Sequence, residues 1–178
     1  MADEGASPSE QFIEAARRNN IDLLHEVIAD IKAKQPDNTT AVAELLNSSQ
    51  DPLGNTPLHL AAANGSYEVL DVLLEQDGLE IDPINRQQGD TPLHAAVRYA
   101  ETEPEHGAFI VEMLVDVGAD PRIKNKAGQR PIDLAADSNT ELINVLQGAE
   151  FARTAGPVVS IDEEDVAAED EANGSDSD

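Results

Sequence analysis

The sequence predicts an all-α solenoid of about four stacked helix–turn–helix repeats, and three observations carry this prediction. A threonine-proline-leucine-histidine motif begins at Thr56 and again at Thr91, and a degenerate copy begins at Arg130. Each copy is followed by a second apolar block. The core must be aliphatic, because 40% of the residues are hydrophobic but only 3% are aromatic. Repeated helix hairpins of this kind bury their apolar faces against the neighbouring units.

The two regular copies have the signals of a helix hairpin. Thr56 and Thr91 are predicted N-caps, each followed by a proline whose missing N–H costs nothing at the first helical position. Gly65 stands where the first helix should end in a left-handed turn. The second helix of this unit places its apolar residues on one face: Val69, Leu70, Leu73 and Leu74.

The remaining units depart from this pattern. A fainter first unit spans 9–31, and an insertion at 32–50 holds a predicted short helix, Thr40–Asn47. The regular units span 51–84 and 85–123, and the second of these has extra residues, including Pro104, in an expected loop between its helices. The last unit, 124–149, lacks the threonine and the histidine. Degenerate end copies are expected, because terminal repeats act as caps.

We therefore predict a repeat domain at 9–150 between a disordered N-terminus, 1–8, and a disordered acidic tail, 151–178. The formal charge is −25, from 36 acidic and 11 basic residues. Such a charge disfavours direct nucleic-acid binding and favours a basic protein partner. We expect the stacked hairpins to leave a negatively charged groove for that partner.

Targeting signals are not apparent. The first ten residues lack the apolar stretch of a secretory signal, and no apolar run is long enough for a membrane span. Cysteine is absent, so disulfides and thiolate chemistry are excluded. We expect a monomeric cytoplasmic protein without membrane contact; nuclear entry stays open, because no lysine- or arginine-rich import signal is visible.

The repeated histidines, His59 and His94, could indicate a metal pair or a catalytic base. We favour a structural role in which each histidine bonds its own N-cap threonine and the backbone of the neighbouring unit. We treat His25 and His106 as surface residues, in a helix and an inserted loop. Nucleophile, phosphate-loop and zinc motifs are missing. We therefore expect no enzymatic activity, no catalytic or metal-binding residue and no cofactor.

The segments Gly54–Gly65, "GNTPLHLAAANG", and Val117–Asn125, "VGADPRIKN", resemble the ankyrin repeat. The resemblance covers roughly residues 10–149 and implies β-turn fingers between the helix pairs. It also implies that partner contacts come from the turn tips and from the inner face of each first helix. The residues at these positions are Leu53, Asn55, Asn64, Gln87, Asp90, Arg98, Tyr99, Lys124, Lys126 and Gln129.

A finer resemblance concerns the fungal ankyrin-repeat chaperones of a newly made small-subunit ribosomal protein. It is carried by the short array, the acidic tail, and the segments Ala119–Gln129 and Ala61–Gly65. It implies a chaperone that escorts a basic ribosomal protein during ribosome biogenesis. Two alternatives stay open: a signalling adaptor or inhibitor of a kinase or transcription factor, and a scaffold within a larger complex.

The basic segment Arg122–Arg130 and the acidic tail also leave alternatives. The basic segment could receive an acidic partner, receive the tail, or be a solvated turn. The tail could shield a basic client, dock on the basic segment, or only add solubility. Ser175 and Ser177 lie among acidic residues and are weak candidates for phosphorylation.

Overall fold

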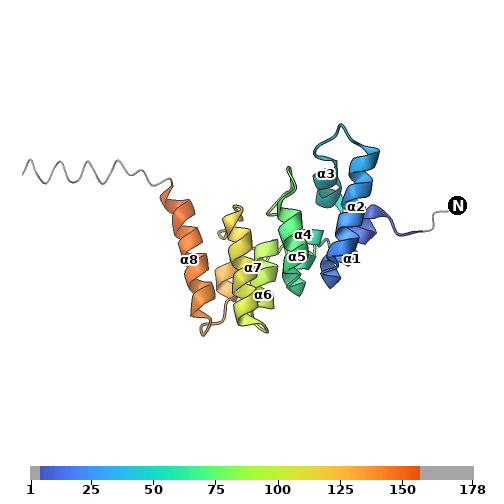
Figure 1. Ribbon diagram of the computed structural model, residues 1–178. Coiled ribbons are helices and arrows are strands. Elements are labelled where there is room, and N and C mark those ends of the chain that lie inside the picture. Colours follow the sequence, from blue (N-terminus) through green and yellow to red (C-terminus); the bar gives the residue numbers. More distant parts are fainter. Residues whose placement is uncertain (1–4, 157–178) are drawn as a thin grey trace, which may run out of the picture.

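The computed structural model describes residues 5–156, and its regular structure in that range is entirely helical (Figure 1). This confirms the all-α prediction. The predicted disorder of 1–4 and 157–178 lies outside the described residues. The elements are, in order, α1 (Pro8–Arg18), α2 (Ile21–Lys34), α3 (Ala41–Ser48), α4 (Pro57–Asn64), α5 (Tyr67–Leu74), α6 (Pro92–Tyr99), α7 (Pro104–Asp116), η1 (Pro131–Leu134) and α8 (Thr140–Ala155).

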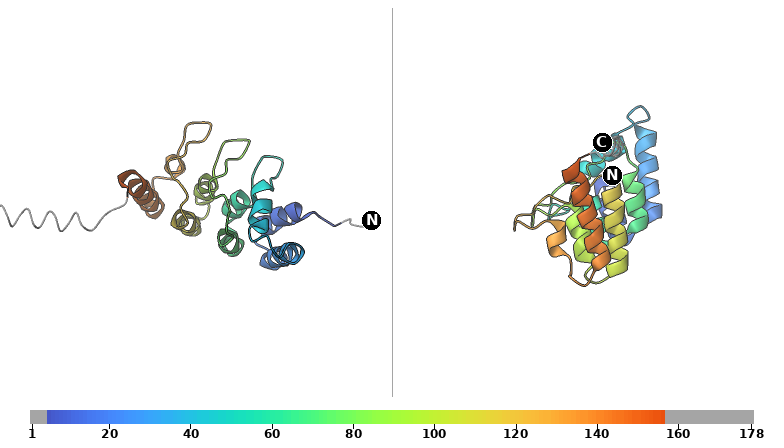
Figure 2. Two further views of the ribbon diagram at one scale, coloured as in Figure 1. Left: turned by 90° about the horizontal axis from the view of Figure 1, so that it is seen from above. Right: turned by 90° about the vertical axis from the view of Figure 1, so that its left-hand side faces the viewer.

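The helices form two rows, an inner row of α1, α4, α6 and η1 and an outer row of α2, α5, α7 and α8. Successive inner elements contact one another, and three loops extend from the same side of the stack (Figure 2). The alanine pairs Ala15-Ala16 and Ala61-Ala62 are completely buried. Their small side chains let the backbones of successive hairpins approach closely, and Ser66 donates a 2.7 Å hydrogen bond from α5's N-cap to the Ala16 carbonyl.

The predicted helix boundaries of the regular units follow from their capping residues. Thr56 caps α4 and Thr91 caps α6, each with proline at the first helical position. Gly65 ends α4 at a positive φ of 66°. It is also packed so closely that a Cβ there would overlap the Tyr99 ring. Both conformation and space therefore favour glycine at this position.

The insertion contributes α3, which confirms the predicted short helix, and it packs against α1 and α2. Asn47 at its end ties it to the following unit. The amide of Asn47 donates to the Gly78 carbonyl at 3.0 Å and accepts from the Glu80 N–H at 2.8 Å. The insertion is therefore part of the stack and contacts both the first and the second unit.

The terminal units differ from the prediction in three places. The first helix of the last unit is a single 3₁₀ turn, because Arg130 supplies no threonine-type cap and, within residues 5–156, no further inner helix packs beyond it. The second helix, α8, continues past residue 150 to Ala155, where Arg153 reaches back to the Gly118 carbonyl. At the other end, α1 begins at Pro8, just after Ser7 caps it, within a segment predicted to be disordered.

Candidate functional site

Three loops, which we call the fingers, connect the hairpins at residues 50–55, 84–91 and 123–130. Each finger is closed by one short polar side chain that accepts two backbone hydrogen bonds. Asp51 Oδ1 accepts from Leu53 and Asn55, both at 2.9 Å. Asn85 and Asn125 do the same in the other two fingers. This geometry fixes each turn without depending on the tip residues.

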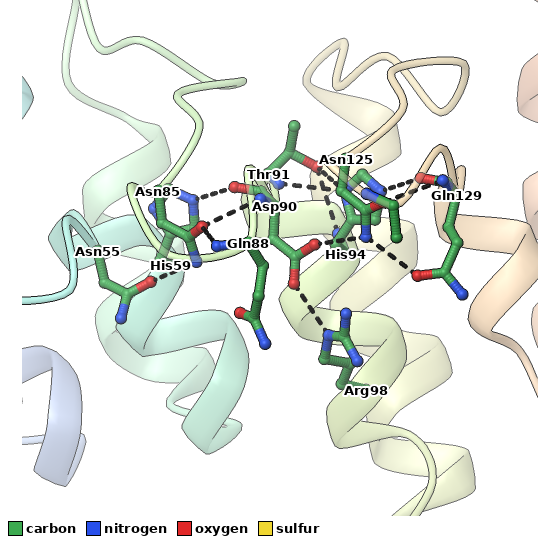
Figure 3. Close-up of polar contacts among 11 residues, drawn as sticks. Asn55, His59, Asn85, Gln88, Asp90, Thr91, His94, Arg98, Asn125 and Gln129 are labelled. Carbon is green, nitrogen blue, oxygen red and sulfur yellow. Dashed lines mark hydrogen bonds and ion pairs between the residues drawn. The ribbon is translucent and has the colours of Figure 1, made fainter.

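Polar side chains also join each finger to the next (Figure 3). The Asn85 amide donates to Asn55 Oδ1 at 2.9 Å, and the Asn125 amide donates to Asp90 Oδ1 at 2.9 Å. Backbone bonds run in parallel, from the N–H of Arg86 to the carbonyl of Leu53, for example. The fingers are therefore held in a fixed ladder rather than moving independently.

His59 and His94 are the buried joints of this ladder. His59 Nδ1 accepts from the Thr56 N–H at 3.1 Å, so its Nε2 carries the proton and donates to the Asp90 carbonyl at 2.8 Å. His94 repeats this arrangement, with Thr91 on one side and the Gln129 carbonyl on the other. The predicted structural role of both histidines is confirmed.

Both joints are held in the neutral form. Burial lowers the pKa of His59 and of His94 below the ordinary value, because the charged imidazolium loses its hydration there. A second proton would also remove the acceptor that Nδ1 offers to the threonine N–H. Within residues 5–156, no group of three or more His, Cys, Asp or Glu is placed to hold a metal ion.

Beside the ladder lies a groove between the first two fingers and the inner helices, which we call the inner groove. Its charged lining consists of Asp90 and Arg98, which form an ion pair at 2.9 Å with Asp90 buried at 2% exposure. The expectation of a negatively charged groove was therefore wrong. The lining is Leu53, Asn55, His59, Leu60, Ala63, Asn85, Gln87, Gln88, Asp90, Ala95, Arg98, Tyr99 and Thr102.

Six of the ten predicted partner-binding residues lie together in this groove. Asp90 is one of them, but its carboxylate is occupied by Arg98 and Asn125, so it organises the surface from beneath. The exposed members at the finger tips are Leu53 and Gln87. The other groove members of the predicted set are Asn55, Arg98 and Tyr99.

The structure does not place the other four predicted residues in the inner groove. Asn64 is exposed at the end of α4 and bonds the Leu60 carbonyl. Lys126 lies against the other side of the fingers and donates to the Arg86 carbonyl. Lys124 is exposed on the third finger, and Gln129 is half-buried beside Asn125.

The two arginines of the basic segment are paired with carboxylates of its own surroundings. Arg122 binds Asp120 through two nitrogens, at 3.0 Å each. Arg130 binds Asp133 and Glu150. The exposed Lys124 and Lys126 are left to give the third finger a local positive charge.

Several residues were not found from the sequence. His106 was assigned to a loop, but Pro104 starts α7, and His106 sits on that helix, half-buried, with its Nδ1 3.0 Å from the Tyr99 hydroxyl. Leu60 and Ala95 line the inner groove without any motif to mark them. Each finger has a short polar residue just before the N-cap position of its unit: Asp51 and Asn125 stand five residues before Thr56 and Arg130, and Asn85 stands six before Thr91. This recurrence was the signal that could have revealed their finger-closing role.

Comparisons with known proteins agree with this architecture. A family model described as ankyrin repeats, in three copies, matches residues 12–125. An ankyrin repeat-containing protein of Saccharomyces cerevisiae is 55% identical over 154 residues, which is 85% of this chain and 83% of that protein. The rat (Rattus norvegicus) protein phosphatase 1 regulatory subunit 12A is 33% identical over 135 residues, 76% of this chain but 12% of that protein.

A further similarity is to the NF-kappa-B inhibitor zeta of Bos taurus, 25% identical over 188 residues, 86% of this chain and 26% of that protein. This chain thus spans only a small part of the last two relatives. Within residues 5–156, no helix combines the length and apolarity that crossing a bilayer requires.

Ankyrin repeats are protein-binding modules, and the predicted ankyrin fold is confirmed. The chain belongs to the family of ankyrin-repeat proteins.

Proposed function

We propose that this protein is a non-catalytic escort for a basic protein client, of the kind that a ribosomal protein represents before its assembly. The observation that carries the proposal is the net charge of −25 on a protein-binding scaffold. An excess of carboxylates raises the rate of encounter with a basic client and competes with its premature binding to other polyanions.

The inner groove supplies the specific contacts in this proposal. Its amide side chains, Asn55 and Gln87 among them, can donate and accept hydrogen bonds, and the Tyr99 ring offers a rigid aromatic surface. The ladder of hydrogen bonds holds these groups in place before binding, which reduces the entropy that binding would cost. Charge brings the client near, and the groove selects it.

A second candidate is a signalling adaptor or inhibitor. The groove itself is nearly neutral, and the fingers bear the exposed cations Lys124 and Lys126, which suit a neutral or acidic partner better than a basic one. The relatives named as a phosphatase regulatory subunit and as an NF-kappa-B inhibitor are similar to this chain over most of its length. We expect the cytoplasm as the site of action of the escort, with the nucleus as an alternative.

Affinity purification with mass spectrometry at low and at high salt separates the two candidates. The full chain is compared with a groove variant, Leu53→Ser with Gln87→Arg, and with a matched control, Val117→Ser with Gln147→Arg. Both pairs replace one exposed aliphatic and one exposed glutamine, but the control pair lies outside the groove lining.

The escort proposal expects a basic ribosomal protein that is captured at low salt, released at high salt, and lost from the groove variant but not from the control. Capture of a kinase, phosphatase or transcription factor that persists at high salt would instead support the adaptor. Equal capture by the groove and control variants would contradict a role for the groove.

A further inference from the structure

The outer row of helices carries an exposed apolar surface that the inner groove does not use. The chain contains only two tyrosines and three phenylalanines. Tyr67 and Phe109 are nevertheless on the outside, at 42% and 47% exposure. Large apolar side chains that are exposed together on a surface often mark an interaction site.

These residues line a shallow groove across three successive outer helices, α2, α5 and α7, which stand side by side in Figure 1. Phe109 and Met113 are one turn apart on α7 and therefore face the same way. We call this surface the outer patch; its lining is Ile21, His25, Tyr67, Glu68, Asp71, Val72, Phe109 and Met113.

The aromatic side chains of the outer patch are fixed by one another. The Tyr67 and Phe109 rings meet edge to face, with centroids 6.2 Å apart. The Tyr67 ring also meets the His106 ring at 5.6 Å, and His106 is held by the Tyr99 hydroxyl at 3.0 Å. A partner would therefore meet rings that are already in position, which favours tight binding.

The charge around the patch selects its occupant. Within α5 and α7, both of which the structure describes in full, the formally charged side chains are all carboxylates: Glu68, Asp71, Glu105, Glu112 and Asp116. The third helix of the patch, α2, contributes Ile21 and His25 to the lining from its first two turns, and its lysines, Lys32 and Lys34, lie in its last turn. Glu68 and Asp71 lie in the patch lining itself. Apolar anchors edged with carboxylates complement an amphipathic helix whose apolar side chains are flanked by lysine or arginine.

The other candidate occupants are disfavoured by the same charge. Residues 157–178 contain many carboxylates and neither lysine nor arginine, and a second copy of the chain would bring the same acidic rim. An anionic lipid surface would be repelled as well. We propose that the outer patch binds a basic amphipathic α-helix of a protein partner, with Tyr67 and Phe109 as its anchors.

A designed peptide tests this proposal without knowledge of the natural partner. The probe is a fluorescently labelled peptide of about 18 residues, a length that spans about 27 Å as a helix, with leucines on one face and lysines on the other. Two control peptides have the same composition in scrambled order, or glutamate in place of lysine. Binding to the full chain is followed by fluorescence anisotropy at about 0.15 M salt, which screens general attraction.

Matched variants separate the patch from the overall charge. Phe109→Ser should weaken binding about tenfold or more, as expected for an aromatic anchor, whereas Phe151→Ser removes a more exposed phenylalanine outside the patch and should leave the affinity within about twofold. Asp71→Lys should weaken binding several-fold, whereas Asp37→Lys, an equal change in charge on the loop after α2, should have a smaller effect.

Equal losses in Phe109→Ser and Phe151→Ser would overturn the proposal, and so would equal affinity for the scrambled peptide. Because Phe109→Ser could disturb α7, hydrogen exchange on the wild-type chain gives a second measure. The peptide should protect α5 and α7, and protection confined to the fingers would overturn the proposal. The inference does not depend on the escort function. The variant Leu53→Ser with Gln87→Arg, which changes the inner groove and not the outer patch, should therefore bind this peptide with unchanged affinity.

Discussion

Removing the imidazole of His94 would leave the buried Thr91 N–H without a partner. It would also take away one of the two hydrogen bonds that the Gln129 carbonyl accepts, since that carbonyl also accepts from the Asn125 N–H at 2.9 Å. A buried polar group without a partner costs roughly 1–3 kcal/mol. We therefore predict that His94→Ala lowers the free energy of unfolding by about 1–3 kcal/mol in urea titrations. The control, His25→Ala, changes an exposed side chain and should stay within about 0.5 kcal/mol. A similarly small change in the free energy of unfolding for both variants would show that the His94 joint does not stabilise the fold.

The same histidines predict how stability depends on pH. Because burial lowers the pKa of His59 and His94, the unfolded chain binds protons at a higher pH than the folded chain does. The contribution of the two histidines to the free energy of unfolding should therefore be fully present above about pH 6.5. It should decline as the pH falls from there toward the lowered pKa values of the folded state. Urea titrations at pH 7.5, 6.5 and 5.5 test this. Constant or rising stability over that interval would contradict the neutral, buried assignment.

At the scale of elements, two glycines give opposite predictions for the same substitution. Gly65→Ala puts a Cβ at a positive φ and against the Tyr99 ring, so it should destabilise the protein by roughly 1–3 kcal/mol. Gly148 lies inside α8 with open space around its Cα, so Gly148→Ala should stabilise by about 0.5–1 kcal/mol. Thermal melts of the two variants are the measurement, and changes of the same sign would contradict the account.

Local signals made some elements predictable from the sequence. Thr56 and Gly65 mark both ends of α4 through interactions with the chain close to them, so its boundaries needed no knowledge of the fold. The histidine joints were also predictable, because the motif repeats intact. Local sequence therefore specifies the positions that recur in each regular unit.

Other elements depend on residues far away in the chain. The first helix of the last unit is shortened to η1 because no repeat follows it in the part of the chain that the structure describes. The α8 helix extends through Arg130–Glu150 and Arg153–Gly118 contacts. The groove's charge was mispredicted for a similar reason: net composition does not say that Asp90 is buried against Arg98. Pairings of this kind appear only once the units are stacked.

At the scale of the whole molecule, the charge of −25 should make salt act in opposite directions on folding and on binding. Repulsion among the excess carboxylates opposes the compact state, and salt screens it. We predict that raising sodium chloride from about 0.02 M to about 0.3 M raises the melting temperature while it weakens the complex with a basic client. A melting temperature that falls with salt would mean that attractive ion pairs, such as Asp90–Arg98, outweigh the repulsion.

The two surfaces lie on different rows of the stack, so one protein can hold one partner in the inner groove and meet a basic helix on the outer patch. We propose that the captured client binds in the inner groove, which the finger ladder holds in shape. The test is hydrogen–deuterium exchange of the full chain, free and with that client. We expect protection of the first two fingers, 50–55 and 84–91, and of α4 and α6; an unchanged exchange rate in those segments while the client is bound would contradict the claim.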